Sequence, residues 1–262
     1  ERESEFSQMG WGSFNAYFRD VMRGDLYDYR IKGFLFGDYR PGEDIDDVKS
    51  LLNGTSSGKM KTYVNPGHAI NFLEVHDDYC FNDYIRFSLG LNQKSDVIKD
   101  PMKHIKLNEL QLKINKLGAM FLLLSKGVPI IHQGQEWAHS QVIASASSND
   151  VNIGKMDRNP YNKDNATNWV NWSELSINAD LVNYYKNLIK LRKEFPVLSS
   201  QNVENALFDT GRYVGDLVEV SQDPVYLCAI QYQPFWMKFW DHWQNAIKEN
   251  KKNKQEHDSS TS

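Results

Sequence analysis

The chain has 262 residues and a formal net charge of −4, with 40% hydrophobic and 24% charged residues. This composition is that of an ordinary globular protein. The small net charge gives no general attraction to nucleic acid or to anionic membranes. The sequence contains no run of about 18 apolar residues, so no membrane-spanning helix is predicted. The two cysteines, Cys80 and Cys228, form no disulfide framework, so the sequence assigns no compartment.

The first third of the chain predicts a strand that runs into a helix and then a long loop. "WGSFNAYF", from residue 11, starts the strand–helix segment, and Gly24 stands near the end of the helix. Residues 38–69 are rich in Gly, Asp, Ser and Pro, with one short helix predicted around 44–52. Residues 69–75, "AINFLEV", are apolar apart from Asn71 and Glu74 and predict a strand buried on both faces.

The middle of the chain predicts a parallel sheet. Residues 105–125 have apolar side chains at three- and four-residue spacing, which predicts an amphipathic helix. A short apolar strand follows, closed by Gly134. A helix between two buried strands is the βαβ pattern of a parallel sheet. A second amphipathic helix is predicted over 181–198, stopped by Pro196, after a long polar segment at 139–173.

Polar and aromatic residues follow both buried strands. His76, Asp77, Asp78 and Tyr79 come after the first, and "HQGQEW", ending in Trp137, comes after the second. Because functional groups of parallel sheets gather at the carboxyl ends of strands, the two sets are expected to meet at one cleft. Carboxylates beside aromatic rings suit a polyhydroxylated ligand. The structural alternative is an Asp that caps the next helix with a hydrogen-bonded His beside it.

These motifs resemble a known family. "INFLEVHDDY" resembles the strand-seven motif of the α-amylase superfamily of glycoside hydrolases, and "GVPIIHQGQEW" resembles its strand-eight segment. Residues 11–37 are similar to a segment of the pullulanase and debranching-enzyme branch, "DVNIGKMDRN" to its loop after strand eight, and "LIKLRKEFPVL" to the helix that closes its barrel. The matches follow the order of the family and cover roughly residues 10–200.

The resemblance implies an α/β fold. Residues 1–200 would be the C-terminal portion, about strands six to eight, of a (β/α)8 TIM barrel. Residues 201–235 would begin a small antiparallel β domain, and residues 236–262 are expected to be a divergent, disordered tail. A three-strand piece of a closed barrel leaves sheet edges and inner faces uncovered, so the missing front part of the barrel is an expected partner.

The resemblance also implies a retaining α-glucan hydrolase of the pullulanase type. By matching position, Asp77 would be the third family carboxylate, which stabilises the transition state, and His76 would bind substrate beside it. Asp78 stands where the family usually has Asn. Tyr79 and Trp137 are candidate sugar platforms, with core packing as the alternative for each ring.

Two of the three family carboxylates have no counterpart in the sequence. The family's nucleophilic Asp and acid Glu lie at the ends of strands four and five, and no segment here resembles either motif. The chain by itself is therefore expected to be inactive. The rival hypothesis is a non-catalytic relative that binds glucan or another protein.

No cofactor is expected, although the resemblance allows calcium, with Asp150, Asp157 and Asp164 as candidate ligands in the polar segment. His132, Glu136 and His139 would form a metal-binding face if they were helical, but Gly134 and the preceding strand argue against a helix. Glu136 is expected to brace its loop, and no metal site is predicted there.

Overall fold

The computed structural model describes residues 2–56, 58–145 and 150–199. The expected β domain (201–235) and tail (236–262) lie outside these residues. The α-helices and strands are α1 (Arg2–Gln8), β1 (Ser13–Asn15), α2 (Ala16–Arg23), α3 (Ile45–Leu52), β2 (Ala69–Asn71), α4 (Phe81–Ser88), α5 (Pro101–His104), α6 (Glu109–Leu124), β3 (Val128–Pro129) and α7 (Ala179–Glu194). Short 3-10 turns connect several of them.

The three strands form one parallel sheet in the order β1-β2-β3. Both neighbouring pairs are joined by helical crossovers, so the predicted parallel βαβ arrangement is confirmed. The strands are shorter than the sequence predicts, because β2 pairs only as far as Asn71. Phe72 and Leu73 continue as buried chain without ladder partners. The strand prediction for 69–75 therefore overshot by four residues at its carboxyl end.

Local capping chemistry explains where the predicted helices begin and end. The Asn15 side chain accepts a hydrogen bond from Phe18 N at the start of α2, and Gly24 ends that helix at a φ of 113°. A side chain at Gly24 would meet the Ile31 carbonyl oxygen at 2.4 Å, so only glycine fits the turn. Asn108 opens α6 with a capping box. α7 ends at Glu194, two residues before the predicted stop at Pro196.

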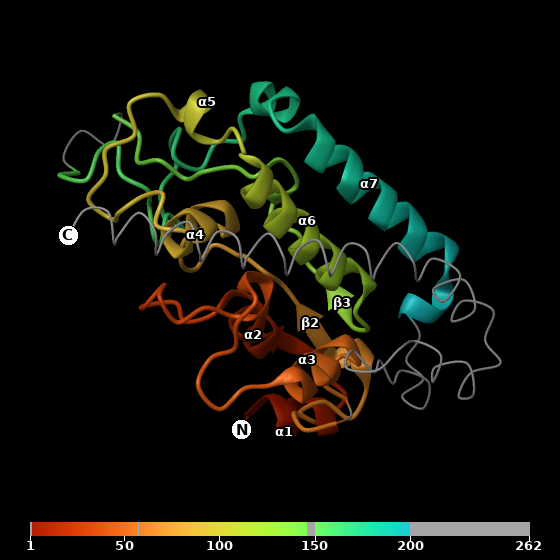
Figure 1. Cartoon of the computed structure of the whole chain (residues 1–262). Helices are drawn as coiled ribbons and strands as arrows, with labels where there is room; N and C mark the ends of the chain where they lie inside the picture. The colour runs from red at the N-terminus through yellow and green to blue at the C-terminus, as the bar shows by residue number, and fades with distance from the viewer. Residues whose placement is uncertain (1, 57, 146–149, 200–262) are drawn as a thin grey trace, which may run out of the picture.

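Helix α6 lies at the centre of the packing. Figure 1 shows α7 running alongside α6, with α2 and α3 further from α7. Leu73, just after β2, and Phe81 of α4 approach α6 at Gly118. A Cβ added at Gly118 would lie 2.8 Å from the Phe81 ring and 2.9 Å from Leu73 Cδ1. Among the described residues, no helix combines the length and the apolar character needed to cross a lipid bilayer.

A buried polar network joins the strands to the loop before β2. Asn15 donates from Nδ2 to Thr55 Oγ1 and to Asn71 Oδ1, both at 2.9 Å. Asn71 Nδ2 donates to the Lys126 carbonyl oxygen at 2.8 Å. Since buried amides need partners, this network explains why Asn71 interrupts an otherwise apolar run.

One row of apolar side chains on the sheet is exposed. Phe14, Ile70 and Val128 are register partners across the three strands. Phe14 is 52% and Val128 45% exposed, and Ile70 is half-buried. The opposite row, which includes Asn15 and Asn71, is buried. The sheet thus has one covered face and one apolar face open to solvent.

Arg192 ties the last described helix to the turn before β3. Its guanidinium donates to the carbonyl oxygens of Leu123, Ser125 and Gly127 at 2.6–2.8 Å. Replacing Arg192 with Met should lower the free energy of unfolding by about 2 kcal/mol, because three carbonyls lose a charged donor. Lys190→Met is the control, since Lys190 is 73% exposed on the same helix, and urea denaturation should show little change. Equal losses in both variants would contradict this role.

Candidate active site

Arg23 holds the loop that follows β2 in place. Arg23 is fully buried on α2, and its guanidinium donates to the Leu73 carbonyl oxygen at 2.8 Å and to the Tyr79 carbonyl oxygen at 3.0 Å. Its charged centre also lies 4.2 Å from the Tyr84 ring centroid. One side chain therefore holds both ends of the segment that carries His76, Asp77 and Asp78.

His76 and Asp77 project from this loop into solvent. Their side chains are 61% and 59% exposed, and His76 Nε2 lies 3.3 Å from Asp77 Oδ1. The His76 ring lies 6.4 Å from the Tyr161 ring, centroid to centroid. Neither Asp77 nor Asp78 caps the following helix, because α4 starts after Cys80 without a side-chain cap. The capping alternative therefore does not describe these residues.

Asp78 adopts a left-handed backbone conformation, with φ at 62°. Asn and Asp tolerate this region better than most residues, which is consistent with the Asn expected at this position. The Asp78 carboxylate accepts hydrogen bonds at 2.8 Å from Arg158, whose guanidinium stacks 4.4 Å from the Tyr27 ring centroid. Arg158 therefore neutralises the charge that Asp78 adds beside Asp77.

The two candidate sugar platforms are buried. Tyr79 is 7% exposed and packs 4.8 Å from the Phe87 ring, centroid to centroid. Trp137 is 1% exposed, and its indole N–H donates to Glu174 Oε2 at 3.2 Å. In both cases the core-packing alternative describes the ring, because each side chain is almost entirely buried.

Behind the exposed pair lies a buried carboxylate with two histidine partners. Glu74 Oε1 lies 2.9 Å from His139 Nε2 and 3.2 Å from His132 Nδ1, and Glu74 Oε2 accepts a hydrogen bond from Phe81 N. Burial alone raises the pKa of Glu74, but the charges and hydrogen bonds of the two histidines outweigh it and hold that pKa well below its usual range. Burial lowers the pKa of His139, yet the Glu74 charge moves it upward overall. The charged forms of Glu74 and His139 stabilise each other.

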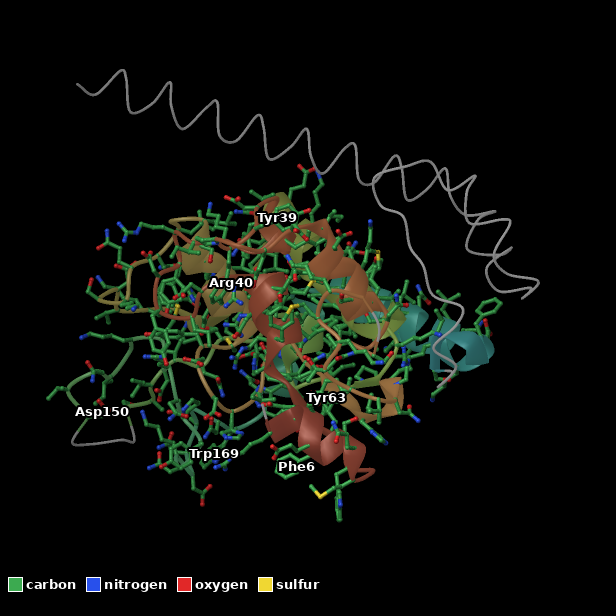
Figure 2. All side chains as sticks on the ribbon, turned by 90° about the horizontal axis from the view of Figure 1, so that it is seen from below. Phe6, Tyr39, Arg40, Tyr63, Asp150 and Trp169 are labelled. Carbon is green, nitrogen blue, oxygen red and sulfur yellow. The ribbon has the colours of Figure 1, made fainter. Side chains whose placement is uncertain are left out.

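A cavity of about 910 Å³ adjoins these groups. Its walls include His76 and residues from the segments after β3, namely His132, Trp137, His139, Tyr161, Asn168, Trp169, Asn171 and Glu174. Asp77 borders His76 but is not part of the wall. Tyr161 and Trp169 are 65% and 67% exposed, and Figure 2 shows Trp169 near one edge of the molecule, on the side that also carries Asp150. The predicted meeting of the two strand ends is thus observed for His76 and Trp137.

Two of the three candidate calcium ligands, Asp150 and Asp157, are paired with a lysine. Lys163 Nζ lies 3.2 Å from Asp150 Oδ2 and also contacts Asp157 Oδ2. The two carboxylates are therefore neutralised by a lysine, and a calcium ion would have to displace it. Glu136 accepts a hydrogen bond from Gly134 N at 2.9 Å, so it braces its loop as predicted.

Sequence reasoning missed Arg23, Glu74 and Arg158. Glu74 carried a signal that could have been used, because it is an acidic residue inside a run predicted to be buried. Arg23 and Arg158 carried none, since arginine is ordinarily exposed and their partners lie 50 or more residues away.

No protein-family model matches the chain. Among curated proteins it is similar to a pullulanase of Bacillus subtilis (strain 168), at 29% identity over 189 residues, which are 71% of this chain and 22% of that protein. It is also similar to an isoamylase of Flavobacterium sp, at 28% identity over 219 residues, which are 79% of this chain and 25% of that protein. The chain is a relative of the α-amylase-family debranching enzymes.

Solved structures agree with this relationship. A pullulanase from Bacillus subtilis str. 168 complexed with maltose matches with a TM-score of 0.56 and 26% identity, over 73% of this chain and 23% of that one. A pullulanase from Paenibacillus barengoltzii in complex with maltohexaose and alpha-cyclodextrin matches with a TM-score of 0.57 and 23% identity, over 80% of this chain and 29% of that one. The chain spans about a quarter of the length of the curated proteins it matches.

Proposed function

We propose that this chain forms about strands six to eight of a (β/α)8 barrel in a retaining, pullulanase-like α-glucan hydrolase. The reaction would be hydrolysis of α-1,6-glucosidic bonds in pullulan, starch or glycogen. The observation that carries the proposal is the exposed pair of His76 and Asp77, held at the carboxyl end of β2 beside a large cavity. The similarity to pullulanases and the parallel order β1-β2-β3 support it.

In this proposal, Asp77 stabilises the transition state. Its carboxylate is free of cationic partners other than His76 in the described contacts, so it can stabilise developing positive charge on a sugar ring. His76 donates to sugar hydroxyls. Asp78, held by Arg158, fixes the loop and borders the substrate. Tyr161 and Trp169 take the platform role, because their exposed rings border the cavity while Tyr79 and Trp137 support it from behind.

In this proposal, a polypeptide segment outside the chain supplies the nucleophile and the general acid. The exposed row of Phe14, Ile70 and Val128 supports such a partner, because a barrel buries this face of its sheet. A segment that supplies the remaining strands would cover the row and bring its own carboxylates to the same edge. The chain on its own is then inactive towards glucans.

The test uses the full gene product that contains this segment, assayed for release of reducing ends from pullulan. Asp77→Asn should lower kcat about 10²–10³-fold and leave the affinity for maltotriose nearly unchanged, because the carboxylate acts in the transition state. Asp180→Asn is the matched control, since Asp180 is 68% exposed on α7 and paired with Lys116. Pullulan hydrolysis that survives Asp77→Asn would refute the assignment of Asp77.

A second function, glucan binding without hydrolysis, is favoured by one observation: neither motif for the other two family carboxylates occurs in the chain. Under this alternative the full gene product shows no turnover, and Asp77→Asn weakens maltotriose binding in calorimetry. A protein that neither binds maltotriose nor cleaves pullulan would exclude both functions.

A further inference from the structure

Three buried side chains of types that bind metals lie close together beside the cavity, and one of them, His139, belongs to its wall. Glu74, Cys80 and His139 each place one ligand atom within 4.8 Å of the other two. The Glu74 side chain and Cys80 are fully buried, and the His139 side chain is 13% exposed. The residues come from two segments, the loop after β2 and the turn after β3, so the fold assembles the set.

We propose that Glu74, Cys80 and His139 form a binding site for a transition-metal ion, with Zn²⁺ as the natural occupant and His132 as the fourth ligand. Thiolate, imidazole and carboxylate are together the donor set of zinc, whereas calcium and magnesium take oxygen ligands only. This site differs from the face that the sequence suggested, because Glu136 is engaged with Gly134 N and Glu74 replaces it.

The geometry suits a small tetrahedral ion. Glu74 Oε1 is 2.9 Å from His139 Nε2 and 3.2 Å from His132 Nδ1. Zinc–ligand bonds of about 2.0–2.3 Å separate neighbouring ligand atoms by roughly 3.3–3.7 Å. The imidazole and carboxylate atoms are therefore close to the required spacing, and Cys80 lies within 4.8 Å of Glu74 and His139, so it must move towards them by no more than about 1–1.5 Å to bind the ion.

Charge and access also fit the ion. Bound Zn²⁺ displaces the thiol proton of Cys80 and the proton shared by His139 and Glu74. Both protons leave to solvent. The resulting thiolate and carboxylate balance the two positive charges, so the buried site carries no net charge. An ion can enter from the cavity, because His132 and His139 line its wall and the His132 side chain is 28% exposed.

Cobalt titration of the full 262-residue chain tests the site, with Co²⁺ as the probe after removal of metals by a chelator. We expect about one equivalent to bind, with the visible absorption of tetrahedral cobalt and a near-ultraviolet thiolate-to-cobalt band, and Zn²⁺ should remove both. Cys80→Ser should abolish the near-ultraviolet band. The control is Cys228→Ser, which removes the other cysteine and should leave the band unchanged. His132→Gln should weaken binding at least about tenfold.

X-ray absorption of the zinc-loaded wild-type chain gives a readout that needs no variant. One sulfur near 2.3 Å with nitrogen and oxygen neighbours near 2.0–2.1 Å is the expected shell. The proposal is overturned if no cobalt band appears, if the band survives Cys80→Ser or disappears in Cys228→Ser, or if the zinc shell holds no sulfur. In those cases the cluster is an ion pair only.

Discussion

Replacing Arg23 with Met should lower the free energy of unfolding by about 3 kcal/mol and loosen the loop that carries His76 and Asp77. The guanidinium is buried and donates to the carbonyl oxygens of Leu73 and Tyr79, which would lose their charged donor and stay in an apolar interior. Losses of 3–5 kcal/mol are common when one partner of a buried charged group is removed. Chemical denaturation measures the loss.

Hydrogen exchange distinguishes a local effect from a general one. Amides of residues 74–80 should exchange faster in Arg23→Met than in the wild type when the two proteins are compared at the same free energy of unfolding. Arg19→Met is the matched control on the same helix. Arg19 pairs with its neighbour Asp20 at 2.7 Å and lies 5.4 Å from the Phe72 ring centroid, but in the described contacts it donates to no carbonyl oxygen of residues 73–79, so exchange of residues 74–80 should stay at the wild-type rate in this variant. Unchanged exchange in residues 74–80 would contradict the positioning role of Arg23.

Replacing Glu74 with Gln should cost about 3 kcal/mol of stability in the presence of a chelator. The carboxylate accepts from His139, His132 and Phe81 N at once, and an amide has one acceptor oxygen where the carboxylate has two. The amide NH₂ must then face a donor, and His139 loses the charge that stabilises its protonated form.

Glu136→Gln is the control for this substitution. Glu136 lies in the same region, and its one described hydrogen bond, from Gly134 N, is one that an amide oxygen can accept equally well. Thermal unfolding of this variant should match the wild type within about 0.5 kcal/mol. If Glu74→Gln were as stable as Glu136→Gln, the buried cluster would contribute nothing to folding.

Local patterns were sufficient to predict most regular elements. The helix periodicity at 105–125 and 181–198, and the N-terminal strand–helix segment ending at Gly24, are all observed. The helices α1, α4 and α5 and the end of β2 were not predicted. Pairing in a sheet ends where a neighbour departs, and β1 turns into α2 immediately after Asn15, so the length of β2 depends on another part of the chain.

The candidate site was predicted only in outline. The spacing of polar residues after two buried strands predicted that these loops would meet, and His76 and Trp137 do border one cavity. The exposure of each ring could not be read from the pattern. Tyr79 and Trp137 are buried, whereas Tyr161 and Trp169 are open, because neighbouring loops decide which face of an aromatic ring remains free.

The sequence by itself determined the parallel α/β organisation, the helices α2, α3, α6 and α7, and the His76–Asp77 pair, since these depend on short-range periodicity and motif order. The tertiary structure alone decided that Arg23 lies under the loop, that Arg158 neutralises Asp78, and that Glu74 meets two histidines. Each of these contacts joins residues 50 or more positions apart, and the contacts of Arg23 and Glu74 bury a charge. A charge is stable in the interior only when folding brings an opposite charge or a hydrogen-bonding group to it. The residues next to it in the sequence do not indicate which residue that partner will be.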